Sequence, residues 1–377
     1  MKMIKRISIL ILAMMMFMAM ATPAFADGQY TQPIDTTNAT ISMNAFIIVD
    51  EYVNILPNMR IGYSIKNASS DESGIKNGIE ANKITINGNN SMGFVLITQQ
   101  TTLQTKDKVI DYPELNGKIN DNQKFAVLPL TIDFSNVEYK EPGIYRYSLI
   151  DDYHMLAIKN GEDDDVDMEI YTNTRYIDVY VENNDNLDGL KISNIIVYAD
   201  DEASTKDDSY IYEYKTFDLD LSKILKGNQA NMNEKFPFTI SINNNLSLEC
   251  EYTITTSNNE TYTLKTNGSG QGSTTIELGH NDIITIHSLP YGAMVSISEV
   301  NGDYTAKYTI SEDKSEVSSN DGNKIENYEI IKDAEIVFTN TKEGIIPTGV
   351  MLSMGPYLGL AIFGIVGLGL TKRKKNI

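Results

Sequence analysis

Phe217-Asp218-Leu219-Asp220-Leu221-Ser222-Lys223-Ile224-Leu225 is the stretch of sequence from which the fold can be worked out. Apolar and polar side chains alternate along it, which is typical of a β-strand with one buried face. The positions on the buried face read Phe, Leu, Leu, Lys, Leu. Lys223 therefore stands where the alternation requires an apolar side chain.

Two later strands have a polar residue on the inward face in the same way. The inward series of Val295–Glu299 ends on a glutamate, and that of Ala334–Asn340 ends on an asparagine. Burying an unpaired charged group is costly, so such side chains need partners. We expect Lys223, Glu299 and Asn340 to be partners for one another. The alternative is that all three lie at strand ends and face solvent.

A buried lysine, glutamate and asparagine allow one specific reaction. An apolar site lowers the pKa of the lysine and raises that of the glutamate, so both groups can be neutral together. The amine of Lys223 can then attack the side-chain carbonyl of Asn340. A protonated Glu299 can hydrogen-bond that carbonyl and move protons while ammonia leaves. The product is a Lys–Asn isopeptide bond, formed in a single autocatalytic event without enzymatic turnover.

The strand pattern continues through most of the chain, with no helical period sustained over three turns. Short strands at a spacing of roughly ten residues are typical of β-sandwiches. We predict an all-β fold with two tandem immunoglobulin-like sandwiches, residues 34–215 and 216–343, divided near residue 215 after the charged segment 200–209. The predicted strands are 45–49, 60–65, 93–98, 125–134, 143–150, 175–181 and 190–198, then 217–225, 236–242, 251–255, 274–278, 283–286, 295–300, 304–310 and 334–339.

Both ends of the chain carry targeting segments. Residues 1–26 have a basic start, an apolar run and a small-residue cleavage site, which is typical of a signal peptide. Residues 344–377 contain Ile346-Pro347-Thr348-Gly349, an uncharged run at 351–370 long enough for a transmembrane helix, and a basic tail. This order resembles the cell-wall sorting signal of Gram-positive surface proteins. It implies cleavage of the Thr348–Gly349 bond by a sortase; the alternative is an ordinary tail anchor.

The composition argues against several classes of partner and site. The chain has 51 acidic against 31 basic residues, a net charge of −20, which argues against nucleic acid or anionic lipid as a partner. Cys250 is the one cysteine of the sequence, so no intrachain disulfide can form. The three histidines are not spaced as zinc ligands, and the acidic run 161–165 lacks the spaced ligands of a calcium loop. We expect no metal, no cofactor and no enzyme activity.

Four ordered motifs identify the second predicted domain, and together they resemble the β-sandwich modules of pilin isopeptide-linkage proteins. That resemblance implies the same roles as the chemistry above: a bond between Lys223 and Asn340, with Glu299 as the proton shuttle. The motifs are Ser222–Asn228, Phe236–Ile240, Leu289–Gly292 followed by Val295–Glu299, and Ile336–Lys342.

The first predicted domain carries Asp133–Val137, Glu141–Tyr147 and Tyr176–Val181. These motifs resemble the N-terminal domain of streptococcal-type backbone pilins, which are Gram-positive proteins assembled by sortases.

The reactive triad of that family is missing from the first domain. No lysine occurs between Lys5 and Lys66, and the positions aligned with the family's lysine are about Met43 and Asn44. The glutamate position is Asp151, and the asparagine position falls on Tyr212. We expect this domain to keep the fold without the covalent bond.

The resemblance implies a structural pilin subunit or pilin-like protein of the cell wall. A class C or housekeeping sortase would join it to other pilin subunits or to peptidoglycan, after a stage as a membrane-anchored precursor. The family's acceptor lysine corresponds to Lys206, which can equally be a solvated linker residue. The alternative is a minor pilin or monomeric adhesin that does not polymerise.

Overall fold

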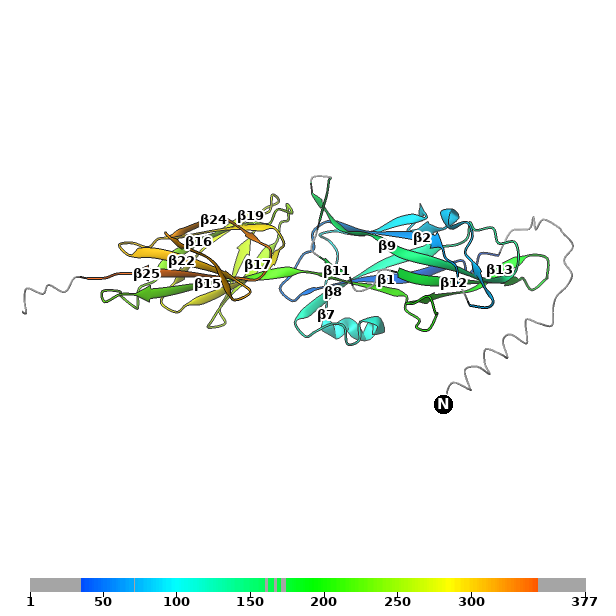
Figure 1. Cartoon of the computed structure of the whole chain (residues 1–377), viewed down its shortest axis with the longest axis horizontal. Helices are drawn as coiled ribbons and strands as arrows, with labels where there is room; N and C mark the ends of the chain where they lie inside the picture. The colour runs from blue at the N-terminus through cyan, green and yellow to red at the C-terminus, as the bar shows by residue number, and fades with distance from the viewer. Residues whose placement is uncertain (1–34, 71, 160–161, 166–167, 171–173, 345–377) are drawn as a thin grey trace, which may run out of the picture.

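The computed structural model describes residues 35–344, except 71, 160–161, 166–167 and 171–173. The predicted signal peptide, sortase motif and membrane span lie outside these residues. Within the described part of the chain, no helix is long and apolar enough to cross a membrane. The structure is nearly all-β, and two sandwiches lie end to end along the long axis (Figure 1).

Two sheets enclose the core of the first sandwich. Side chains from both meet in one apolar cluster that includes Met43, Tyr63, Leu130 and Tyr212. In the order of their pairing, the first sheet holds β11 (Met168–Ile170), β14 (Ser209–Tyr214), β1 (Thr40–Asp50), β8 (Gln123–Asp133), β4 (Thr85–Ile86) and β5 (Asn89–Asn90), with β7 (Gln104–Thr105) beside β8. The second holds β13 (Leu190–Tyr198), β12 (Thr174–Asn183), β9 (Gly143–Lys159), β2 (Met59–Asn67) and β6 (Met92–Ile97), with β3 (Ile75–Asn77) and β10 (Glu162–Asp165) beside β9.

Three short 3₁₀ helices belong to the first domain: η1 (Ala81–Lys83), η2 (Lys106–Asp111) and η3 (Pro113–Leu115). Val109 from η2 and Leu115 from η3 pack on Phe46 and Phe125 of the first sheet. This smaller cluster covers the face of β1 and β8 that points away from the main core, so β1 is buried on both faces.

The second sandwich has a larger and a smaller sheet. The larger holds, in order, β18 (Thr261–Lys265), β17 (Glu251–Thr256), β20 (Ile283–Pro290), β15 (Thr216–Lys226), β25 (Ala334–Thr341), β22 (Thr305–Glu312) and β23 (Ser315–Asp321). The smaller holds β19 (Gln271–Leu278), β16 (Phe236–Asn243), β21 (Ala293–Glu299) and β24 (Lys324–Ile330).

The first and last main strands of each sandwich lie side by side and parallel. β1 pairs with β14 in the first domain, and β15 pairs with β25 in the second. All fifteen predicted strands overlap observed ones, because period-two alternation marks strands that bury one face. The polar strands β18, β23 and β24 were not predicted, since they lie at or near sheet edges and alternate weakly.

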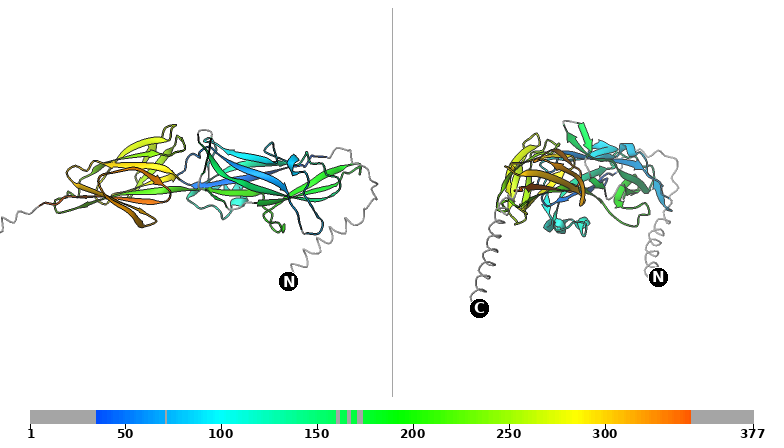
Figure 2. Two further views of the ribbon diagram at one scale, coloured as in Figure 1. Left: turned by 45° about the horizontal axis from the view of Figure 1, so that its top comes forward. Right: turned by 60° about the vertical axis from the view of Figure 1, so that its left-hand side comes forward.

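The sequence analysis predicted no strand between residues 198 and 217, but the structure has one there. Ser209–Tyr214 forms β14, a buried strand next to β1. Lys215 alone separates β14 from β15. The short connection joins the two domains through nearly continuous strands (Figure 2, left).

Further contacts fix the joint between the two domains. The ring of Tyr52 stacks on that of His287 with centroids 4.0 Å apart, and Ser288 Oγ donates a hydrogen bond to Asp50 Oδ1 at 2.9 Å. Ile55 of the first domain packs against the core cluster of the second. These contacts and the one-residue linker make the joint stiff.

The Tyr52–His287 stack gives a testable consequence. Tyr52→Ala removes an aromatic contact worth about 0.5–1.5 kcal/mol, so the joint should bend more while each domain keeps its own stability. Small-angle scattering of the variant should show a broader distribution of lengths, and calorimetry should show unchanged domain transitions. Tyr262→Ala, on the exposed strand β18, is the control. A variant as stiff as the wild type would show that the stack does not hold the joint.

Candidate functional site

The three residues singled out in the second domain meet in its core. Lys223 extends from β15 and Asn340 from the adjacent strand β25, and Glu299 reaches them from β21 in the facing sheet. Lys223 and Asn340 are 0% exposed and Glu299 is 3% exposed. The solvent-facing alternative is therefore wrong, because the inward series of each strand stays buried to its polar end.

Glu299 bridges the two nitrogen atoms of the cluster. Its Oε1 lies 2.6 Å from Lys223 Nζ and accepts a hydrogen bond of 2.8 Å from Asn340 Nδ2. We expected Glu299 to contact the carbonyl of Asn340, but it contacts the amide nitrogen. Among the described residues, neither Asn340 Oδ1 nor Glu299 Oε2 has a hydrogen-bond partner.

Aromatic rings enclose the lysine. Lys223 Nζ lies 4.8 Å from the ring centroid of Phe236 and 5.8 Å from that of Phe238. The ring of Phe238 packs edge-on against Phe338 at 5.2 Å. The cluster is therefore closed off from water by apolar groups, and its electrostatic interactions act in a low-dielectric environment.

This environment shifts both ionisable groups toward neutrality. Burial lowers the pKa of Lys223 to about 8, although Glu299 favours its charged form. Burial raises the pKa of Glu299, against the opposing effect of Lys223 and Asn340. Each group is thus closer to its uncharged form than it would be in water, as the sequence analysis anticipated.

The register of the first domain shows what replaces the triad there. In the second domain Asn340 pairs with Leu225, two residues after Lys223, and Glu299 pairs with Phe238. In the first domain Tyr212 pairs with Ile47, so the residue in the lysine position is Ala45. With Tyr212 in the asparagine position, strand pairing puts the lysine position one or two residues after the aligned Met43 and Asn44, because only pairing fixes the register.

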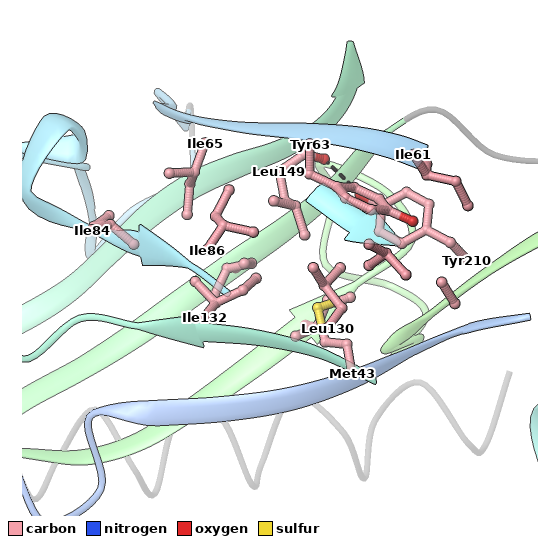
Figure 3. Close-up of a cluster of buried hydrophobic side chains, with 14 of the residues drawn as sticks. Met43, Ile61, Tyr63, Ile65, Ile84, Ile86, Leu130, Ile132, Leu149 and Tyr210 are labelled. Carbon is pink, nitrogen blue, oxygen red and sulfur yellow. Dashed lines mark hydrogen bonds between the residues drawn. The ribbon is translucent and has the colours of Figure 1, made fainter. Parts of the chain in front are cut away.

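Asp151, which the sequence alignment puts in the glutamate position, lies on β9 and pairs with Tyr63 of β2. Tyr212 and Tyr63 share a hydrogen bond of 2.9 Å between their hydroxyl oxygens. Figure 3 shows Tyr63 beside Tyr210 and above Met43 in the apolar core. A pair of tyrosines thus joins the first domain's sheets where the second domain has its triad.

The candidate acceptor Lys206 lies on an exposed segment that side-chain hydrogen bonds hold. The Asp200 carboxylate accepts hydrogen bonds from the backbone nitrogens of Ser204 and Thr205 at 2.9 and 3.2 Å. The backbone of Lys206 forms an isolated antiparallel β-bridge with Tyr198 at the end of β13. Ion pairs are found for many lysines of the described chain, but none is found for Lys206.

Two buried charges beneath this segment were not found by sequence reasoning. Arg146 and Asp178 form a bidentate pair at 2.7 and 2.8 Å, and both are almost fully buried. Arg146 also donates to the backbone oxygen of Asp201, so the pair supports the 200–206 segment from below. Both lie on the outward-facing side of β9 and β12, and the covering segment 200–206 buries them.

No group of three metal-ligating side chains occurs among the residues that the structure describes. Cys250 is buried, with Thr266 Oγ1 3.5 Å from its sulfur. The sortase motif Ile346–Gly349 lies beyond the last described residue.

The tyrosine pair of the first domain can be tested directly. Burial raises the pKa of Tyr63 and of Tyr212, so both stay neutral phenols. Tyr212→Phe leaves the Tyr63 hydroxyl without this partner, which should cost about 1–3 kcal/mol. The melting temperature of the first domain should fall by several degrees, with the second domain unchanged. Tyr112→Phe, in the aromatic cluster against Phe46, is the matched control; equal melting of both variants would contradict a role for the hydroxyl pair.

Comparison with known proteins shows what the chain is similar to. A family model described as "Domain of unknown function (DUF7601)" matches residues 217–342. A curated relative named "Pilin", from Streptococcus pyogenes serotype M1, is 24% identical over 259 residues, which are 65% of this chain and 71% of the relative.

Two solved structures from Streptococcus pyogenes have a similar fold. The major pilin superposes with a TM-score of 0.58 at 19% identity, over 81% of this chain and 99% of the pilin. The major pilin protein T3.2 gives 0.51 at 18% identity, with the same coverage. The resemblance to Gram-positive backbone pilins is thereby confirmed, and the chain has a pilin-type backbone fold.

Proposed function

We propose that this protein is a structural pilin subunit, or pilin-like protein, anchored to the cell wall and strengthened by an internal Lys223–Asn340 isopeptide bond. The observation that carries the proposal is the buried cluster in which Glu299 contacts both nitrogens of the exchange. The pilin-type fold supports the same role.

The bond forms by exchange of one amide for another. Lys223 Nζ, as the neutral amine, attacks the Asn340 side-chain carbonyl carbon, and the bond from that carbon to Nδ2 breaks. Glu299, protonated at the start, gives its proton to the departing nitrogen, which leaves as ammonia, and takes one back from the attacking amine. The carboxyl ends in the state in which it began, so no cofactor or oxidant is needed. The contacts of Oε1 with both nitrogens suit this shuttle better than a contact with the carbonyl oxygen would.

The raised pKa of Glu299 and the lowered pKa of Lys223 favour the reactive state. At a pH between the two pKa values, the Lys223–Glu299 pair carries one titratable proton. The reaction requires that proton on Glu299, because Lys223 is then a neutral amine. Burial penalises the ion pair and therefore increases the fraction of the neutral pair. Above both pKa values Glu299 has no proton to deliver, and below both the amine is protonated.

The bond would join the first and last strands of the second sandwich. By analogy with a disulfide, closing a loop from residue 223 to residue 340 stabilises the domain by on the order of 4–5 kcal/mol. Tension applied along the chain would pass from β25 to β15 through a covalent bond. The intervening strands would not need to unfold under load.

Surface attachment follows from the ends of the sequence. The signal peptide 1–26 would direct export, and the span 351–370 with its basic tail would hold the precursor in the membrane. A sortase would cleave between Thr348 and Gly349 and transfer the Thr348 carboxyl to an amine. The protein is not a turnover enzyme in this scheme, and it requires no cofactor or metal.

Two roles differ in which amine receives Thr348. In a polymerising shaft subunit the amine is a lysine of the next subunit. Lys206 is exposed on a supported segment, while Lys191 is engaged by Asp185 and Glu182 at 2.6 and 3.5 Å. In a minor pilin or monomeric adhesin the amine belongs to peptidoglycan. The match to major pilins over both domains favours the shaft subunit.

Mass spectrometry tests the internal bond. The intact processed protein should be lighter by one ammonia than its sequence requires, and Glu299→Ala should restore the full mass. Asn340→Ala should also restore the full mass, because it removes the carbonyl carbon that the amine attacks. A loss of two ammonias would contradict the unlinked first domain, and no loss in the wild type would disprove the bond.

The polymer is tested on cells. Boiled cell-wall extracts should give a ladder at multiples of the mature mass, since isopeptide links survive detergent. Lys206→Ala should reduce the ladder to monomer with surface display intact, whereas Lys118→Ala, another exposed lysine of the first domain, should leave it unchanged.

Three results would revise this picture. A single wall-linked species in the wild type would favour the monomeric adhesin. A ladder that persists without Lys206 would move the acceptor to another lysine, such as Lys191 or Lys215. Thr348 carboxyls found only on peptidoglycan would exclude the shaft role.

A further inference from the structure

The loop that follows β15 holds the last described residues of the chain. Lys342 donates its backbone N–H to Lys226 O at 3.0 Å, and its own carbonyl accepts from the backbone of Gln229 at 3.1 Å. Lys342 Nζ also pairs with Asp303 at 2.8 Å. The strand β25 ends at Thr341, so these contacts hold the chain beyond the regular sheet.

Asn228 binds Gly344 through both the oxygen and the nitrogen of its side-chain amide. Gly344 donates its backbone N–H to Asn228 Oδ1 at 2.7 Å, and Asn228 Nδ2 donates to Gly344 O at 3.1 Å. An amide satisfies a backbone N–H and C=O together only in this orientation, so Asn228 acts on Gly344 as a neighbouring strand would. We call the contacts of Lys226, Asn228 and Gln229 with residues 342–344 the C-terminal bracket.

A glycine allows the loop to come this close. Gly227 has a φ of +101°, in the region that favours glycine. A Cβ at this position would lie 2.2 Å from the backbone oxygen of Lys342. The loop conformation and the close approach therefore both depend on Gly227, and the two sides of the bracket fit each other.

We propose that the C-terminal bracket sets the length of the tether between this domain and the sortase site, with Asn228 as its positioning residue. The effect of this tether on the joint between successive subunits rests on the proposed function. Thr348 is four residues beyond Gly344, so an extended tether reaches about 14 Å from the bracket. If the bracket were open, the tether would start at Thr341, the end of β25, and reach about 25 Å. A short tether restricts how far neighbouring subunits can tilt once Thr348 is joined to the next subunit.

The bracket lies outside the loop that the Lys223–Asn340 bond closes. Tension arriving at Thr348 would reach Gly344 before it reaches Asn340. The isopeptide bond cannot hold residues 342–344 in place, since they follow the linked asparagine and the end of β25 at Thr341. They are held by the bracket and by the contact of Lys342 with Asp303, which separates the bracket's effect from that of the triad.

Hydrogen exchange on the full-length precursor, purified in detergent from a host without sortase, tests the bracket. Asn228→Ala should speed exchange of the Gly344 amide by roughly tenfold, while peptides within β25 keep wild-type protection. Asn233→Ala, on the same loop with an exposed side chain, should change neither. Equal exchange at Gly344 in the wild type and Asn228→Ala would overturn the bracket.

Electron microscopy of filaments from sortase-bearing cells tests the joint. Asn228→Ala should give a ladder of normal intensity but filaments with a shorter persistence length than those of the wild type and Asn233→Ala. Faster exchange with unchanged filament stiffness would overturn the role of Asn228 at the joint. If the wild type gave no ladder, the shaft role and the joint role would both fail, while exchange at Gly344 would still decide whether the bracket exists.

Discussion

The ε-amine of Lys223, enclosed between two sheets and faced by Phe236 and Phe238, is the constraint on which the second domain depends. A lysine cannot remain there as an isolated cation, because the desolvation of its charge would exceed the stability of a domain of this size. Glu299 contacts this amine directly and Asn340 hydrogen-bonds to Glu299, so the lysine is not isolated. Removing either partner would leave a buried charge or polar group unsatisfied, at a cost of about 3–5 kcal/mol for the ion pair. A covalent amide would end the problem, since it contains no charge.

The two domains share one strand topology but carry different side chains where their first and last strands meet. Each places its first main strand parallel to its last, which brings side chains from distant parts of the sequence next to each other. In the second domain the pair of strands carries Lys223 and Asn340. In the first, alanine takes the lysine position, and the hydroxyl of Tyr212 meets that of Tyr63 across the core. The first domain is therefore held by packing and hydrogen bonds, and its resistance to force should be lower.

The mechanical path through the protein follows the same strands. β14 leads into β15 through one residue, and the Tyr52–His287 stack and the Asp50–Ser288 hydrogen bond stiffen the junction. At the far end of the second domain, the C-terminal bracket continues the β15–β25 contact beyond Asn340. In the proposed pilin, tension along the long axis would meet little slack at either joint.

The sequence by itself determined the strands and the identity of the site. Side chains on a strand alternate between faces, so Lys223, Glu299 and Asn340 could be recognised as inward-facing polar residues before their partners were known. The alternation pattern does not tell which strands are neighbours, in what register they pair, or which segments cover them. The tertiary structure decided these. It brought Glu299 to the amide nitrogen of Asn340 instead of the carbonyl, and moved the vacant lysine position from Met43 to Ala45. It also buried Arg146 and Asp178 under a segment distant in sequence, and placed Asn228 against Gly344. Each of these depends on contacts between residues far apart in the chain, for which a local pattern carries no signal.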